Sequence, residues 1–176
     1  MKTLFAIFSL LLLFSAEAAA GRSIEGIVKA VYDGDTILLA ARNGSRLKVR
    51  LYGIDAPETK KPDKPGQQFG EAAKRALSNR IMGRRVTAEI IDIDQYKRSV
   101  AVIRYSGADV NREMVAEGFA WAYRRYLQGP YASEYIGAED LARSRHAGLW
   151  RDANPLPPWE FRKLLKGGGK RHGRQW

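Results

Sequence analysis

Residues 33–58 read DGDTILLAARNGSRLKVRLYGIDAPE, and most of the fold that we expect follows from these residues. An Asn-Gly pair at Asn43 and Gly44 separates two strand-like segments, which is a strong signal for a β-hairpin. The second segment alternates apolar and polar residues, so Arg50 falls on its polar face. The four carboxylates of the stretch lie in the turns at the strand ends. The stretch therefore predicts two paired strands with acidic groups at one end and an arginine beside them.

The four acidic residues are Asp33, Asp35, Asp55 and Glu58, and their chemistry suits a hard cation. Ca²⁺ prefers oxygen ligands on loops, and crowded carboxylates repel each other unless a cation neutralises them. An arginine beside them can bind the oxygens of a phosphodiester bidentately. A divalent ion would stabilise the negative charge that develops on phosphorus, and a further carboxylate can activate the attacking water. The combination predicts metal-assisted hydrolysis of phosphodiester bonds.

The chain outward from this stretch predicts a small closed barrel with helices packed on it. Two further strands are expected over 86–93 and 99–105, and a first strand over 24–32. Helices are expected over 69–81 and 133–146, and a short one follows its N-cap Asp109. Residues 59–68, with two prolines and a glycine, predict an irregular basic loop beside the acidic residues.

The composition narrows both the partners and the chemistry. A net charge of +11 favours a polyanionic partner, either nucleic acid or an anionic lipid surface. The chain has no cysteine, which excludes disulfides, a thiol nucleophile and cysteine-bound zinc. The two histidines, His146 and His172, lie at a helix end and in the C-terminal tail, where they cannot form a Ser-His-Asp triad. An enzyme of this composition would have to work with carboxylates, arginines and a metal.

Both ends of the chain differ from the middle. Residues 1–20 have a basic start, an apolar run too short to span a bilayer and small residues for cleavage, which predicts a signal peptide. We therefore expect export to a periplasm or the outside, with no membrane insertion after cleavage. Residues 151–176 are rich in proline, glycine and basic residues and predict a disordered basic tail. Such a tail could attach to nucleic acid or merely aid solubility, which leaves 21–150 as the domain.

Four motifs follow one another along the chain: DGDT at 33–36, VRLYGIDAPE at 49–58, DQYKR at 94–98 and VNRE at 110–113. Any one of them is weak alone, but together they resemble the thermonuclease family typified by staphylococcal nuclease. The resemblance runs from about Ser23 to Trp150. It implies an α+β fold, a five-stranded OB-type β-barrel with about three packed α-helices, which agrees with the element order above.

The resemblance also implies roles for the acidic stretch. Asp35 and Asp55 would bind Ca²⁺ through their carboxylates, with the backbone carbonyl of Ala56 as a third ligand. Asp33 would lie just outside the ligand shell, and Glu58 would be the general base. Ala56 replaces a threonine of the type member, but only its backbone oxygen is needed.

Further roles fall on the polar face and the later motifs. Arg50 and Arg98 would grip the phosphate, and Tyr96 and Tyr123 would line the nucleotide pocket. Lys97 departs from the family, which usually has glycine there, and it could alter the loop that aims Arg98. The implied activity is cleavage of DNA and RNA with little sequence preference, leaving 3′-phosphate ends. We expect a monomer and no cofactor besides the metal.

Each of these residues has an ordinary explanation when taken singly. Asp33 and Asp35 could form a simple turn, because Asp and Gly are common turn residues. Arg50 and Arg98 could belong to a solvated basic surface, and Tyr123 could be core packing. Two rival functions therefore stay open: a non-catalytic nucleic-acid-binding OB-type module, and an exported protein that binds polyanions or the cell envelope.

Overall fold

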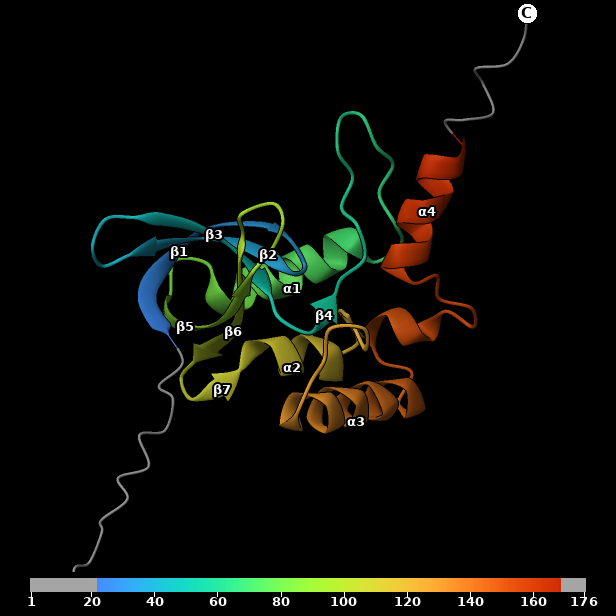
Figure 1. The fold of residues 1–176 in the computed structure, drawn as a ribbon. Helices are drawn as coiled ribbons and strands as arrows, with labels where there is room; N and C mark the ends of the chain where they lie inside the picture. The colour runs from blue at the N-terminus through green and yellow to red at the C-terminus, as the bar shows by residue number, and fades with distance from the viewer. Residues whose placement is uncertain (1–21, 169–176) are drawn as a thin grey trace, which may run out of the picture.

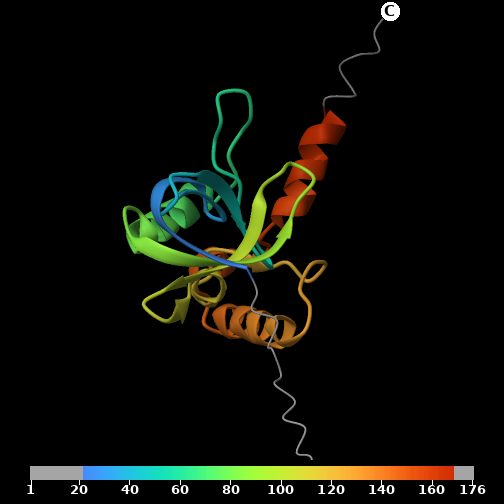
Figure 2. The same cartoon turned by 60° about the vertical axis from the view of Figure 1, so that its left-hand side comes forward.

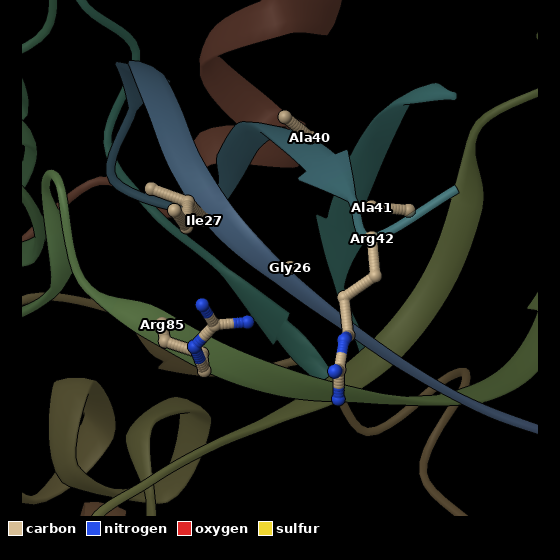
Figure 3. A pocket seen from close by; sticks show the side chains of 6 residues that line it. All are labelled: Gly26, Ile27, Ala40, Ala41, Arg42 and Arg85. Carbon is tan, nitrogen blue, oxygen red and sulfur yellow. The ribbon is translucent and has the colours of Figure 1, made fainter. Parts of the chain in front are cut away.

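Strand β1 (Ser23–Asp33) is the long central strand of the barrel in the computed structural model, which describes residues 22–168 (Figure 1). It pairs antiparallel with β2 (Thr36–Ala41) along one edge and with β5 (Arg85–Ile93) along the other. Register shifts interrupt its pairing with β2, and such bulges bend a strand, as barrel closure requires. A hollow of about 360 Å³ lies where the three strands meet near Gly26, at the opposite end of β1 from Asp33 (Figure 3).

The barrel closes through a parallel pair. Strand β3 (Arg46–Leu51) pairs antiparallel with β2 and parallel with β6 (Ser99–Tyr105), and β6 pairs with β5. The short strand β7 (Ala108–Asp109) extends the sheet beyond β6. Five strands thus form a closed OB-type barrel, as the sequence predicted.

A separate two-stranded pair lies outside the barrel. Strand β4 (Ile54–Asp55) pairs antiparallel with β8 (Trp121–Ala122). This pairing joins the segment after β3 to a part of the chain far along the sequence. It therefore fixes the backbone of Asp55 from outside the barrel.

Four α-helices and one 3₁₀ helix pack around the barrel in the described part of the chain (Figures 1 and 2). Helix α1 (Gly70–Ile81) packs against β1, and α2 (Val110–Ala116) packs against β6 and α3 (Pro130–Ser144). The 3₁₀ helix covers Gly148–Arg151, and α4 (Pro158–Gly168) projects on the same side as the 59–68 loop.

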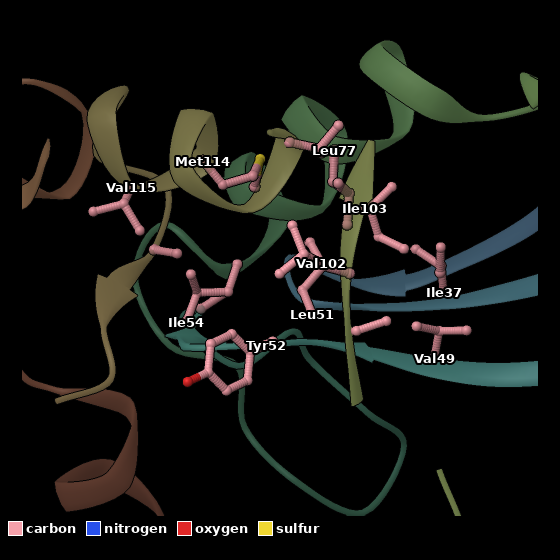
Figure 4. Packing of buried hydrophobic residues seen from close by; sticks show 14 of the residues in the cluster. Ile37, Val49, Leu51, Tyr52, Ile54, Leu77, Val102, Ile103, Met114 and Val115 are labelled. Carbon is pink, nitrogen blue, oxygen red and sulfur yellow. The ribbon is translucent and has the colours of Figure 1, made fainter. Parts of the chain in front are cut away.

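The core joins the barrel to α1 and α2. Its buried side chains interdigitate between the strands and these helices, with those labelled in Figure 4 being Ile37, Val49, Leu51, Tyr52, Ile54, Leu77, Val102, Ile103, Met114 and Val115. Burial of each such side chain stabilises the fold by about 1.5–3 kcal/mol. The strand ends that carry the acidic residues therefore start from a rigid, close-packed body.

Most predicted elements agree with the structure to within a few residues. The Asp109 carboxylate accepts a hydrogen bond from the Arg112 amide at 3.0 Å, so Asp109 is the N-cap of α2 as predicted. The largest difference lies in 151–176, which was expected to be a disordered tail. That expectation is wrong over α4, whose side chains pack against the rest of the fold.

Two other expectations concern residues that lie outside the described part of the chain. These are the signal peptide at 1–20 and the end of the basic tail at 169–176. Between them, in residues 22–168, no helix combines the length and the apolar character needed to cross a bilayer.

Candidate active site

The turn between β1 and β2 carries the first two carboxylates. The Asp35 amide donates a hydrogen bond to Asp33 Oδ1 at 3.2 Å, which holds the two side chains side by side. Gly34 lies between them, and a Cβ there would stand 2.6 Å from Ala56 Cβ and 2.7 Å from Ala73 Cβ. Since real Cβ atoms do not approach so closely, only glycine lets the turn lie against the β4 segment and α1. The DGD sequence is therefore required by packing as well as by the acidic groups.

Arg50 bridges the two predicted metal-binding aspartates. Its backbone lies opposite Thr36 in the β2–β3 ladder. Arg50 Nη1 donates to Asp35 Oδ1 at 2.6 Å, and Nη2 donates to Asp55 Oδ1 at 2.7 Å. The Ala56 amide donates to the other oxygen of Asp35 at 2.9 Å. Both carboxylates are almost fully buried, so Arg50 is needed to balance their charge.

The pKa values show that negative charge is crowded at this place. Burial, and then the neighbouring Asp35 carboxylate, raises the pKa of Asp33 to about 7. Burial also raises the pKa of Asp55, and the hydrogen bonds from Arg162 only partly oppose this. For Asp35 burial acts in the same direction, but the charge of Arg50 and the hydrogen bond from Ala56 outweigh it and lower the pKa. A further positive charge here would relieve repulsion that Arg50 leaves in place.

Glu58 lies at the base of the 59–68 loop, three residues after Asp55. The Gln67 amide donates to the Glu58 carbonyl at 2.8 Å, and the Gln67 side chain accepts from the Glu58 amide at 3.3 Å. A side chain on Gly70 would overlap that same Glu58 carbonyl, so the start of α1 lies directly against it. The backbone of Glu58 is thus fixed, while its carboxylate stays partly exposed to solvent.

Arg98 and Tyr96 lie in a second, more exposed region, the turn between β5 and β6. Asp94 organises this turn, because its carboxylate accepts the Tyr96 and Arg98 amides, both at 2.9 Å, and Arg98 Nε at 2.7 Å. Burial acts to raise the pKa of Asp94, but these hydrogen bonds outweigh it and lower the pKa. The Arg98 guanidinium lies 5.5 Å from the centre of the Tyr96 ring, and that ring is 71% exposed.

Arg50 and Arg98 pair with different carboxylates: Arg50 with Asp35 and Asp55, and Arg98 with Asp94. The parallel ladder places Val100 beside Arg50, so Arg98 is two residues away along the neighbouring strand. Lys97, the residue directly before Arg98, has a φ of 59°, in the left-handed region that favours glycine. The glycine of the family pattern suits this conformation, and lysine occupies it at some conformational cost.

Tyr123 lies close to the acidic residues. It follows β8, and its amide donates to the Gly53 carbonyl at 2.8 Å. Burial, followed by the charge of Asp55, raises the pKa of the Tyr123 hydroxyl. One face of its ring stacks on Trp159 of α4, with centroids 5.2 Å apart and planes inclined by 6°.

Arg162 of α4 is the site residue that the sequence analysis missed. Its Nη2 donates to Asp55 Oδ2 at 2.7 Å, and its Nη1 donates to Asp55 Oδ1 at 3.1 Å and to Glu58 Oε1 at 2.8 Å. Burial acts to lower the pKa of Arg162, but the hydrogen bonds and charges of Asp55 and Glu58 outweigh it and raise the pKa. The available sequence signal was weak: Trp159 and Arg162 lie about one helical turn apart and so share a helix face.

The donor atoms fit a hard divalent cation. Asp35, Asp55 and the carbonyl of Ala56 offer oxygen only, which is the set that Ca²⁺ or Mg²⁺ prefers. Within 22–168 no three acidic or histidine side chains converge in metal-binding geometry, so water or substrate would have to complete the coordination. Burial raises the pKa of the Asp55 carboxyl, so a bound cation would further stabilise its charged form.

Comparison with known proteins agrees with this geometry. Residues 48–152 match the family described as "Staphylococcal nuclease homologue". The chain belongs to the staphylococcal nuclease family. Arg50, Asp55, Glu58 and Arg98 all lie within the matched residues of this family, whereas the DGD turn precedes them.

Several relatives are similar over most of both chains. A protein of Haemophilus influenzae named "Uncharacterized endonuclease" is 36% identical over 159 residues, which cover 90% of this chain and 84% of the relative. The "Micrococcal nuclease" of Shigella flexneri is 35% identical over 156 residues, covering 84% of this chain and 85% of the relative. An "Uncharacterized endonuclease" of Escherichia coli O157:H7 is 36% identical over 141 residues, covering 79% and 85%.

Proposed function

We propose that the protein is an exported, Ca²⁺-dependent nuclease that cleaves both DNA and RNA and leaves 3′-phosphate ends. Its membership of the staphylococcal nuclease family makes it a phosphodiester hydrolase. One observation carries the finer proposal: Arg50 bridges the buried carboxylates of Asp35 and Asp55, with the partly exposed Glu58 nearby. An ion pair that served only to stabilise the fold would not need a further, partly exposed carboxylate such as Glu58 beside it.

The proposed roles follow from the positions of these groups. Asp35, Asp55 and the Ala56 carbonyl would bind Ca²⁺, with Asp33 supporting the Asp35 turn through its hydrogen bond. A cation bound there would offset the charge that develops on the phosphate. Glu58 would take a proton from the attacking water, because its carboxylate is partly exposed to solvent.

The phosphate and the nucleoside would be held by the remaining residues. Arg50 and Arg98 would bind the non-bridging oxygens and stabilise the transition state. Attack of water on phosphorus breaks its bond to the 5′-oxygen, so the phosphate stays on the 3′ side and a 5′-hydroxyl leaves. Tyr96 and Tyr123 would stack on bases, and stacking does not distinguish one base from another. Little sequence preference follows, since phosphate contacts carry no sequence information either.

Export and a monomeric state complete the proposal. Residues 1–20 carry the sequence features of a secretory signal peptide. The net charge of +11 would attract nucleic acid without any further subunit.

The test uses purified protein lacking residues 1–20 and a circular plasmid. Samples contain Ca²⁺, Mg²⁺ or a chelator, and parallel samples with Ca²⁺ contain Glu58→Ala or the control Glu71→Ala, an exposed glutamate of α1. Nicked and linear DNA should form only with Ca²⁺, and not with Glu58→Ala. DNA that is retarded but uncut in every sample would contradict the proposal and favour a non-catalytic nucleic-acid-binding module.

A further inference from the structure

Helix α4 contacts the candidate active site at two separate points. Arg162 pairs with Asp55 and Glu58, and Trp159 stacks on Tyr123 (α4 is red in Figures 1 and 2). These two residues reach the proposed cation site, the proposed general base and the proposed base-stacking tyrosine. A contact that only held α4 to the fold would not need to involve all three of these groups.

The Arg162 contact conflicts with cation binding. Both oxygens of Asp55 accept hydrogen bonds from its guanidinium, at 2.7 and 3.1 Å. A divalent ion binds a carboxylate oxygen at about 2.3–2.6 Å, so it would lie against the guanidinium with like charge. Arg50 already holds Asp55 Oδ1, so with Arg162 on both oxygens no oxygen of Asp55 is left for a cation in this geometry.

The same contact affects Glu58. Its Oε1 accepts a hydrogen bond from Arg162 Nη1 at 2.8 Å. That oxygen is then occupied by the guanidinium and cannot at the same time accept a hydrogen bond from the attacking water. Docking of α4 thus opposes both metal binding and base catalysis.

The Trp159 contact conflicts with nucleotide binding. The parallel stack on Tyr123 covers the ring face that a base would otherwise occupy. Trp159 also packs edge-on against Trp121 at 5.5 Å, which gives the helix a hydrophobic attachment. The cation and the nucleic acid would therefore be excluded by two residues of one helix, Arg162 and Trp159, which lie about one turn apart.

We propose that α4 is an autoinhibitory segment that docks through Arg162 and Trp159 and is displaced when the cation and nucleic acid bind. This inference rests on the proposed function, because it concerns regulation of the same site. Release is physically reasonable, since the Arg162 side chain is 35% exposed and the outer face of α4 carries the exposed Lys163 and Leu164. A single helix of this length gains little stability without its docking contacts.

The first test measures Ca²⁺ binding by calorimetry, without nucleic acid, on the whole mature chain. The proteins are the wild type, Arg162→Ala and the control Lys163→Ala, whose lysine pairs with Glu160 on the same helix and with no other acidic residue within 22–168. Removing the competitor should tighten Ca²⁺ binding about tenfold in Arg162→Ala, and Lys163→Ala should match the wild type. Equal affinities for wild type and Arg162→Ala would overturn the proposal.

The second test measures hydrogen exchange at the amides of α4 and does not depend on activity. Exchange should be faster in Arg162→Ala than in the wild type without Ca²⁺, and Ca²⁺ should accelerate it in the wild type. Equal protection in both proteins, with and without Ca²⁺, would contradict docking through Arg162.

Plasmid cleavage by the same variants separates the two proposals. If neither the wild type nor Arg162→Ala cuts DNA, while hydrogen exchange shows that α4 is released in Arg162→Ala, the proposed nuclease mechanism fails and the docking stands. Loss of cleavage in Arg162→Ala with unchanged Ca²⁺ affinity would assign Arg162 to the phosphate and overturn autoinhibition.

Discussion

Arg50 and Arg98 are proposed to act on the same phosphate, yet the fold treats them very differently. Arg50 extends from a barrel strand into a buried cluster, where it balances Asp35 and Asp55. Arg98 lies on a partly exposed turn and is held by Asp94, four residues earlier. One arginine thus belongs to the core of the fold, and the other belongs to a local turn.

Residues that act on the same phosphate can therefore contribute very differently to the stability of the fold. Removing a partner from a buried ion pair leaves an uncompensated charge, which destabilises by about 3–5 kcal/mol. In the Arg98–Asp94 pair solvent reaches both partners, which are 22% and 19% exposed, and such a pair contributes only about 0–1 kcal/mol. The acidic region therefore resists change, whereas the Asp94 turn can adapt its side chains to the substrate.

The strongest test of the comparison replaces each arginine by alanine. We expect Arg50→Ala and Arg98→Ala each to lower the cleavage rate by about 10²-fold or more, as loss of transition-state stabilisation does. Only Arg50→Ala should also lower the free energy of unfolding, by about 3–5 kcal/mol, and denaturant titration in chelator measures this. Similar stability losses in both variants would contradict the different contributions of Arg50 and Arg98 to the fold.

Glu58 offers the next largest effect, because its carboxylate is the proposed general base yet is partly exposed rather than buried. Glu58→Gln should lower the cleavage rate by about 10²-fold while changing the free energy of unfolding by no more than about 0.5 kcal/mol. Single-turnover kinetics and denaturant titration are the measurements, with Glu71→Gln as the control. Normal turnover by Glu58→Gln would remove it from the role of general base.

The sequence predicted the barrel and most of the acidic cluster, because both depend on local patterns. Alternation placed Arg50 on the polar face of β3, and the Asn43-Gly44 turn brought the carboxylates of the hairpin beside it. Arg162 could not be predicted in this way, since its contact with Asp55 joins residues that are 107 positions apart. Proline and glycine composition indicated disorder, whereas tertiary packing of Trp159 holds the helix in place.

The buried region should also respond to pH through Asp33. Its pKa is raised from 3.8 to about 7 in the folded protein, so the folded state binds this proton more tightly than the unfolded state does. The resulting contribution to stability is fully present below pH 3.8. That stability is lost as the pH rises through about 7. In chelator, Asp33→Asn should therefore be stabilised relative to the wild type more strongly at pH 8 than at pH 5. The stabilisation at the two pH values should differ by about 1 kcal/mol or more. Thermal unfolding at both pH values is the measurement, and an equal gain at each would contradict the assignment.

The smallest expected effect concerns the turn that aims Arg98. Lys97 has a positive φ, so Lys97→Gly should relieve strain but lose some stability through the more flexible unfolded chain. The net change in the free energy of unfolding should be a gain of at most about 1 kcal/mol, with a cleavage rate near that of the wild type. Thermal unfolding and plasmid cleavage test this, and a clear loss of stability would show that the lysine side chain itself supports the turn.

The most direct test of the central claim is a crystal structure of the protein grown with Ca²⁺, in which anomalous scattering locates the ion. We expect an ion at about 2.3–2.6 Å from oxygens of Asp35, Asp55 and Ala56, with Arg162 moved away from Asp55. An ion bound elsewhere, or no ion with Arg162 still paired to Asp55, would contradict the claim that this acidic cluster is the catalytic metal site.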